Sequence, residues 1–350
     1  MGMVWRTLGG RYSNLTTWRS NRFANRLTQR CLASPVSGAP QGNRYMAATA
    51  HRSAGIGHVL SEWNTGLLVA RQLGLTFLHS SVNSPWEEFL GFSLGFQDVR
   101  EVWNKQGVEI IRLPLIDWKN VDVAEAHRSV IEKILSPNPL LFILYDGQNS
   151  FRQHSSGPEL RKIYWGHPRR IGAKSLREAG TISVSVHIRR RNAMDMKNPT
   201  VHDTSGSAYK SRYLDLDYFE QLMDLVNRAV PNQKVVFNIF SQGNPADLDS
   251  LRRFGDVRFR LAESEFNTFH NLAASDILIT SPSSFSFKAG MLCGGIKLCR
   301  SPWWHEIPSD DEWCPTPANP TSESDRIIAF IRSRLPAAQI AAKHLVSLSS

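Results

Sequence analysis

Hydrophobic residues along the chain follow two alternating patterns. Short runs rich in β-branched residues indicate buried strands, and longer runs with apolar residues every three or four positions indicate helices. The first helix is predicted at residues 59–73, because Gly74 supplies a C-terminal cap. The other elements predicted in the first half are strands at 75–78, 108–113 and 140–145 and a helix at 123–135.

The second half repeats the alternation. It begins with a strand at 182–188 and a polar loop at 191–211. Further strands, at 235–240, 257–261, 277–280 and 296–298, alternate with helices at 216–230, 246–254, 265–274 and 284–292. Residues 301–320 are expected to form a long crossover before two helices at 324–334 and 337–346. This order is typical of doubly wound parallel sheets.

The length of 350 residues favours two domains. A polar stretch at 147–180 has the composition of a linker, so we expect one lobe at 45–175 and a second at 176–350. The predicted fold class is therefore α/β, with two Rossmann-like lobes behind an N-terminal segment at 1–44.

The net charge of +10 is concentrated at the N-terminus. Eight arginines and no lysine precede Glu62, the first acidic residue, and subtracting eight from +10 leaves +2. A near-neutral body argues against a nucleic-acid-binding surface. Residues 1–44 have the composition of an organellar transit segment or of a disordered tail. No apolar run is long enough to span a bilayer, so we expect a soluble chain without a transmembrane segment.

The cysteines do not have the spacing of a structural zinc site. Cys293 and Cys299 lie in an apolar stretch and are expected to be buried free thiols, and a disulfide to Cys314 stays open.

Three candidate sites follow predicted strands or precede helices. His187, Arg189 and Arg190 stand at a strand end, where open α/β sheets bind ligands. Arginine presents a planar fork of donors that matches a diphosphate, and a fixed cation there would neutralise a diphosphate leaving group. The period of two puts Arg190 on the opposite face, so we expect Arg189 to contact the ligand and Arg190 to have a structural role. A solvated arginine cluster is the alternative.

The other two candidates are a serine turn and a glycine loop. Residues 281–286 (SPSSFS) precede a helix, where hydroxyl groups and backbone N–H groups bind anions or cap the helix. Residues 55–58 (GIGH) precede the first helix and form either a ligand loop or a tight turn.

Taken in order, GIGH, HIRR at 187–190 and SSFS at 283–286 resemble the motifs of the fucosyltransferase superfamily, which comprises α-1,2-, α-1,6- and protein-O-fucosyltransferases. The resemblance covers roughly residues 45–300. It implies two lobes of GT-B type with the donor in the cleft, inversion, GDP-fucose as donor and no required metal or other cofactor. The residues that it implies for nucleotide-sugar binding are Gly55, Gly57, His58, His187, Arg189, Arg190, Ser241, His270, Ser283, Ser284 and Phe285.

Two residues depart from the family pattern and leave the sugar open. Asn192 stands where the superfamily has an acid after its two arginines, and His58 stands where an amide follows the glycines. The catalytic candidates are Arg189 together with Asp195 or His58 as the base that accepts the acceptor's proton, with Glu62 as a third candidate base. Two Asp-x-Asp sequences, at 215–217 and 247–249, are interpreted as helix starts rather than as metal ligands.

We therefore expect an inverting glycosyltransferase that moves fucose from GDP-fucose to a hydroxyl group of a glycan or protein acceptor. The alternatives are a transferase for another nucleotide sugar, an inactive glycosyltransferase-like binding protein and a basic nucleic-acid-binding protein. The compartment stays open, because relatives in the secretory pathway carry an anchor or signal that this sequence does not show.

Overall fold

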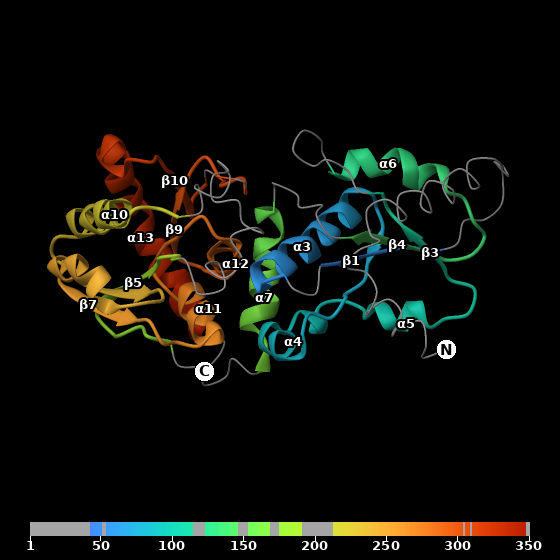
Figure 1. Ribbon diagram of the computed structural model, residues 1–350, viewed down its shortest axis with the longest axis horizontal. Helices are drawn as coiled ribbons and strands as arrows, with labels where there is room; N and C mark the ends of the chain where they lie inside the picture. Colours follow the sequence, from blue (N-terminus) through green and yellow to red (C-terminus); the bar gives the residue numbers. More distant parts are fainter. Residues whose placement is uncertain are drawn as a thin grey trace. The chain divides into compact units, whose positions relative to one another are not determined.

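The computed structural model describes residues 43–50, 54–114, 123–145, 153–168, 175–190, 213–303, 305–308 and 310–347. Contacts along the chain divide it into two compact units. The first comprises the described residues of Met1–Val82 and Gly95–Ser150, and the second those of Asn83–Leu94 and Phe151–Ser350. Each unit contains one parallel sheet with helices packed on it, as predicted (Figure 1).

The first unit is built on a four-stranded sheet in the order β2-β1-β4-β3. All three strand pairs are parallel. The strands are β1 (Arg44–Thr49), β2 (Thr76–Phe77), β3 (Glu109–Arg112) and β4 (Leu140–Tyr145). Strand β2 lies on one side of β1, and β4 and β3 lie on its other side. The strand order therefore reverses between β1 and β4. Ligands bind open α/β sheets at such a reversal.

Among the described residues, three helices build the helical layers of the first unit. Helix α3 (Ile56–Gln72) packs on β1 and β2, and α6 (Val123–Lys133) packs on α3. The short α5 (Val99–Trp103) places Val99 and Val102 in a core with Ala47 and Leu141. The sequence did not predict α5, because a single turn carries too few apolar positions to set a period.

The second unit is built on a six-stranded sheet in the order β10-β9-β8-β5-β6-β7, again with parallel pairs only. Its strands are β5 (Thr181–His187), β6 (Lys234–Phe240), β7 (Asp256–Arg260), β8 (Ile277–Ile279), β9 (Ile296–Arg300) and β10 (Trp313–Thr316). Strands β6 and β7 extend the sheet on one side of β5, and β8 to β10 extend it on the other. The strand order therefore reverses at β5 and β8.

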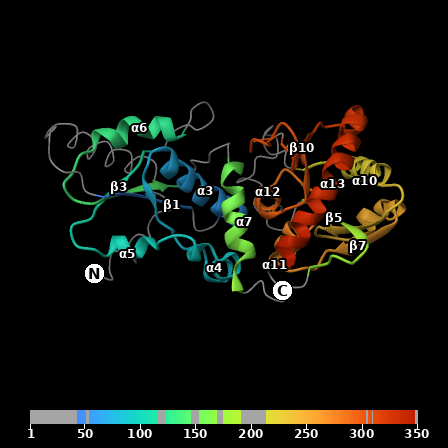
Figure 2. The same cartoon turned by 180° about the vertical axis from the view of Figure 1, so that it is seen from behind.

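The helices of the second unit cover both faces of this sheet. Its larger elements are α7 (Gly157–Trp165), α10 (Leu216–Ala229), η4 (Pro245–Phe254), α11 (Glu265–Ala273), α12 (Ser284–Leu292) and α13 (Ser324–Ser347). Helices α10 and α13 lie side by side and bury the apolar face of β5 (Figures 1 and 2). Helix α11 packs on β5 and α12, and α12 packs on α7.

The stretch expected to be a polar linker contains the short 3-10 helix η2 (His154–Ser156) and α7. Leu160, Tyr164 and Trp165 of α7 are buried, and the indole of Trp165 donates to the Leu292 carbonyl at 2.9 Å. The sequence places the change of domain near residue 175, whereas contacts group α7 with the second unit. A helix of nine residues with one apolar stripe is hard to recognise among glycines and arginines.

Three further elements differ from the prediction. The crossover at 301–320 contains β10, which pairs with β9, and the 3-10 turn η5 (Pro320–Glu323) follows it. The two helices predicted at the C-terminus form a single helix, α13, which continues through Pro336. Proline removes one backbone hydrogen-bond donor but does not have to end a helix. The helix predicted at 246–254 is the 3-10 helix η4.

Residue 44 belongs to the first sheet rather than to the N-terminal segment. Arg44 opens β1, and its guanidinium donates to the Ile134 carbonyl at 2.9 Å. Strand β1 was not predicted, because its sequence RYMAAT has no β-branched residue before its last position. Residues 1–42, including Cys31, lie outside the described residues.

One segment from the first half of the chain packs within the second unit. Helix α4 (Ser84–Leu90), followed by the turn η1 (Phe92–Leu94), lies against α11. Trp86 donates its indole N–H to the Glu265 carboxylate at 3.1 Å, and its ring lies 4.6 Å from that of Phe266.

The cysteines of the second unit are free and buried: Cys293, Cys299 and Cys314. The prediction of free thiols at Cys293 and Cys299 is confirmed, and Cys314 forms no disulfide. In the part of the chain that the structure describes, none of the helices combines the length and hydropathy needed to cross a bilayer.

Candidate functional site

The candidate site of the second unit forms where the strand order reverses. His187 ends β5, and Arg189 and Arg190 follow it, while Ser281 to Ser284 connect β8 to α12. Because β5 and β8 are paired and parallel, both segments leave the same edge of the sheet. The sequence placed these motifs almost a hundred residues apart, and the fold makes them neighbours at the edge where doubly wound sheets bind ligands.

Two serine hydroxyl groups tie the strand ends together. Ser281 Oγ accepts from the Arg189 backbone N–H at 2.8 Å and donates to the His187 carbonyl at 2.6 Å. On the other side of β5, Ser241 Oγ donates to the Ile188 carbonyl at 2.8 Å. The backbone of residues 187–189 is therefore held from both neighbouring strands. Ser281 is the first residue of the serine turn predicted at 281–286, but its hydroxyl bonds the backbone of β5 rather than capping the helix.

Arg189 and His187 lie together at the end of β5. The Arg189 guanidinium lies 5.9 Å above the Tyr213 ring, and its buried Nε has no hydrogen-bond partner among the described residues. Burial and the nearby charge of Arg189 lower the pKa of His187 from its ordinary value to about 3. His187 is therefore neutral at physiological pH, and Arg189 supplies the positive charge.

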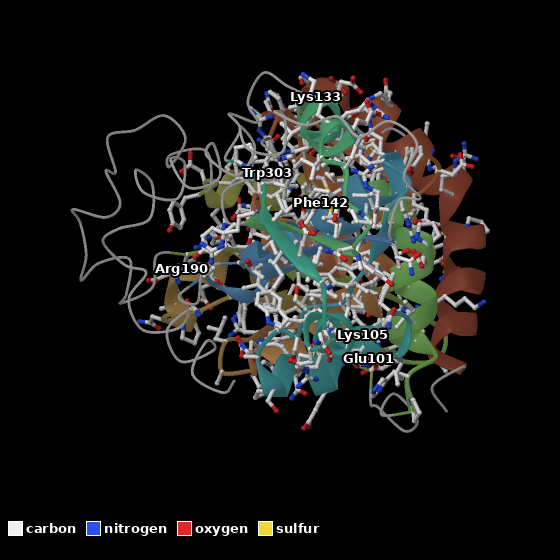
Figure 3. The ribbon with its side chains drawn as sticks, turned by 90° about the vertical axis from the view of Figure 1, so that its right-hand side faces the viewer. Glu101, Lys105, Lys133, Phe142, Arg190 and Trp303 are labelled. Atoms are coloured by element: carbon white, nitrogen blue, oxygen red, sulfur yellow. The ribbon has the colours of Figure 1, made fainter. Side chains whose placement is uncertain are left out.

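Arg190 is turned away to the other side of β5. Its guanidinium forms an ion pair with Asp247 and donates to the Gln242 carbonyl at 3.2 Å. Both partners belong to the segment that follows β6, so Arg190 fastens that segment to the end of β5. Figure 3 shows Arg190 well apart from Trp303, which follows β9.

The N-terminus of α12 is the second candidate for binding an anion. Ser283 is its N-cap, but the Ser283 side chain makes no capping hydrogen bond. The first N–H groups of a helix have no partner within it, and together with the helix dipole they favour an anion. Ser284 and Phe285 are half-buried there, and the Phe285 ring lies 5.6 Å from that of His187.

His305 is a site residue that the sequence analysis missed. It is fully buried beyond β9, and its Nε2 lies 3.1 Å from Ser284 Oγ. A single histidine in an irregular Trp-rich segment gives no periodic signal, so only the fold reveals that it reaches α12.

His270 was predicted to bind the nucleotide sugar. In the structure it lies buried on α11, where its Nδ1 is 3.0 Å from the Tyr164 hydroxyl and its ring packs against Trp165. These contacts connect α11 to α7, so they give His270 a packing role. Its contact with a ligand stays a prediction.

The glycine loop of the first unit also lies at a reversal of strand order. Gly55 is the N-cap of α3, so Gly57 and His58 belong to the first helical turn rather than to a loop before it. The helix begins at Ile56, three residues earlier than predicted. His58 Nε2 lies 3.3 Å from the carboxylate of Glu62, which is almost fully buried. The two side chains form an imidazole–carboxylate pair at a helix N-terminus.

Some of the predicted site cannot be placed. Asp195 and Asn192 lie outside the described residues. Nothing in the structure therefore bears on Asp195 as a base.

No protein-family model matches the chain, and no curated protein matches it. Solved structures do match the chain. POFUT1 in complex with GDP-fucose is 11% identical with a TM-score of 0.38, and the match covers 73% of this chain and 95% of POFUT1. A mutant of Arabidopsis thaliana FUT1 with GDP is 11% identical with a TM-score of 0.44, over 82% of this chain and 76% of FUT1. The E. coli heptosyltransferase WaaC with ADP is 11% identical with a TM-score of 0.44, over 83% of this chain and 99% of WaaC.

The fold is α/β, with one parallel sheet and packed helices in each unit. At these identities and TM-scores the likenesses do not indicate a function, so any function has to be argued from the residues of the site.

The two Asp-x-Asp sequences start helical segments, as predicted. Asp215 is the N-cap of α10, and Asp217 accepts from Gln221 at 2.6 Å in its first turn. Asp247 and Asp249 lie in η4, where they pair with Arg190 and Arg252. Within the described ranges, no cluster of three or more histidine, cysteine or acidic residues could hold a metal ion.

Proposed function

We propose that this chain is a glycosyltransferase that uses a nucleotide-diphosphate sugar. The observation that carries the proposal is the junction of β5 and β8, where Ser281 joins the backbone of Arg189 to the turn that starts α12. A fixed guanidinium and a helix N-terminus at one edge of a sheet suit the two charged groups of a diphosphate. Negative charge develops on the diphosphate as its bond to the sugar breaks. These hydrogen-bond donors therefore bind the departing diphosphate more strongly than the intact nucleotide sugar.

For the donor we propose GDP-fucose. The ordered motifs at 55–58, 187–190 and 283–286 support this choice, because together they resemble those of fucosyltransferases. Another nucleotide sugar is the second candidate, and Asn192 favours it, since the superfamily has an acid there.

A thermal-shift panel tests the donor class. A ligand at a hundred times its Kd stabilises the folded chain by about 2.7 kcal/mol, which gives a clear rise in Tm. We expect GDP and GDP-fucose to raise the Tm, and UDP-sugars and ADP to leave it unchanged. Stabilisation by a different nucleotide alone would replace GDP-fucose as the donor, and stabilisation by none would contradict a nucleotide site.

Arg189→Ala tests the diphosphate contact. We expect GDP to bind roughly 10–100-fold more weakly by calorimetry, because one hydrogen-bonded charge partner is lost. Arg189→Lys keeps the charge but loses the fork, so it should recover only part of the affinity. The control is Arg228→Ala on the exposed side of α10, where the arginine pairs with Asp224 at 3.6 Å. Unchanged GDP affinity in Arg189→Ala would exclude the contact.

For the base we propose His58. Inverting transfer needs a group that accepts the proton of the acceptor hydroxyl, and a histidine oriented by a carboxylate suits that role. His58→Gln should lower kcat by about 100-fold or more while leaving GDP affinity unchanged. Full activity in that variant would leave Asp195 as the candidate, and an inactive binding protein would show GDP affinity without turnover in the unmodified chain.

A further inference from the structure

His305 belongs to a stack of rings behind the N-terminus of α12. Its imidazole lies face to face with Phe287, with ring centroids 4.5 Å apart and planes 10° from parallel. Trp303 packs edge-on against it at 4.8 Å. His305 itself is fully buried. These two aromatic neighbours fix the plane of the imidazole, and with it the direction in which Nε2 points.

That direction leads to Ser284. Ser284 opens α12, and its Oγ lies 3.1 Å from His305 Nε2. A serine hydroxyl has one hydrogen to donate and two lone pairs, so its neighbour decides which of these is left for a ligand. If Nε2 accepts, the hydroxyl hydrogen is used up and only lone pairs face outward. If Nε2 carries a hydrogen and donates, the hydroxyl hydrogen is left to donate elsewhere.

The surroundings select the second arrangement. Ser284 stands at the positive end of a helix, on the same strand junction as Arg189, and both favour an anion. An anion accepts hydrogen bonds, so a hydroxyl beside it has to donate. We propose that His305 is a positioning residue that donates through Nε2 and thereby turns the Ser284 hydroxyl toward a phosphate group of the donor. The inference rests on the proposed nucleotide-diphosphate site.

Packing alone does not account for a histidine at this position. A phenylalanine or leucine would fill the space next to Phe287 without burying a polar ring, which costs free energy unless the ring forms hydrogen bonds. A hydrogen bond made by a ring nitrogen is therefore the reason for an imidazole here, and Nε2 reaches Ser284.

The test is a double-mutant cycle on the full chain, with GDP and inorganic pyrophosphate as the probes. Ser284→Ala and His305→Phe should each weaken pyrophosphate binding by about tenfold, the loss of one hydrogen bond to a charged group. If His305 acts through Ser284, the double variant should bind about as well as either single variant. His305→Gln places an amide N–H near the position of Nε2 and should restore most of the affinity.

Two outcomes overturn the inference while leaving the proposed function in place. One is additive losses in the double variant, and the other is an unchanged affinity in His305→Phe at an unchanged Tm. A merely structural role would lower the Tm of His305→Phe and of His305→Gln without the non-additive effect on binding. If the unmodified chain binds neither probe, the proposed function fails, and the inference fails with it.

A second measurement does not depend on any nucleotide. Nitrogen-15 shifts of His305 in the unliganded chain report which ring nitrogen carries hydrogen. We expect Nε2 to be protonated and its signal to move in Ser284→Ala. An unprotonated Nε2 contradicts the proposed direction of the hydrogen bond even if GDP binds.

Discussion

At the scale of single residues, the end of β5 directs two neighbouring arginines to different partners. Arg189 and Arg190 are adjacent, yet Arg190 is held by Asp247 and Gln242 while the Arg189 guanidinium lies over Tyr213. The period of two along a strand predicts this divergence. Their different partners mean that the two arginines should respond differently to substitution.

The titration of His187 is the first prediction at this scale. Its pKa is about 3, lowered first by burial and then by the charge of Arg189. In the unfolded chain a histidine has a pKa near 6.5, so the unfolded state binds more protons and folding stability falls as the pH drops from about 6.5 toward 3. In Arg189→Gln the charge is gone, so the pKa of His187 should rise while staying below 6.5.

Proton NMR of the His187 ring in Arg189→Gln, with Arg228→Gln as the control, measures this change. An identical His187 titration in the two variants would mean that Arg189 does not act on the imidazole. Since burial is the larger cause, full recovery to 6.5 would contradict the packing around the ring.

At the scale of elements, Gly243 shows how a turn depends on its glycine. Its φ of +91° is one that residues with side chains rarely adopt, and an added Cβ would stand 3.0 Å from the Arg190 guanidinium. Gly255 is a matched control, because its φ is +107° but an added Cβ there meets no atom within 4 Å. Alanine at either position should cost about 1–2 kcal/mol in backbone strain.

Only Gly243→Ala should also loosen the segment after β6, because it displaces Arg190 from Gln242 and Asp247. Hydrogen exchange at residues 241–247 measures the difference between the two variants. Equal exchange in both would show that Arg190 does not fasten this segment.

The elements also show which parts of the fold a sequence can predict. Strands β4 to β9 and helices α10 to α12 lie within a few residues of the predicted bounds. Strand β1, helices α4, α5 and α7 and strand β10 escaped prediction, because short elements owe their formation to tertiary partners. At the site, the motifs indicate Arg189 and the serine turn at 281–286, whose contacts with a ligand stay predictions, whereas His305 is found only because the fold brings it next to Ser284.

At the scale of the whole molecule, a charged network connects distant parts of the second unit. Glu312, just before β10, accepts from Arg161 of α7 at 2.6 Å and from the fully buried Lys297 of β9 at 2.5 Å. Burial alone would raise the pKa of Glu312, but hydrogen bonds and charges from Arg161 and Lys297 outweigh it and lower the pKa to about 2. The network therefore stabilises the fold fully above about pH 4.5 and loses its effect as the pH falls toward 2.

Glu312→Gln should destabilise the chain by about 1–2 kcal/mol at pH 7, because the buried Lys297 ammonium loses its carboxylate while solvent screens part of the pair at the 37% exposed Glu312. Urea unfolding at pH 7 and pH 3 measures the effect, which should shrink at the lower pH. The control is Glu323→Gln, which removes an exposed pair with Arg326 and should change stability by less than about 1 kcal/mol. Equal effects of the two substitutions would rule out a role for burial.

The position of α4 has a consequence for synthesis on the ribosome. Trp86 finds its partner Glu265 only 179 residues later in the chain. At about 5–20 residues per second, Trp86 emerges roughly 10–40 seconds before α11 exists to receive it. During that interval the Trp86 indole lacks its contacts with Phe266 and Phe269 of α11 and is left with Phe89 as its neighbour. A nascent chain halted before residue 265 should therefore recruit chaperones or aggregate, even though the sheet of the first unit is already complete.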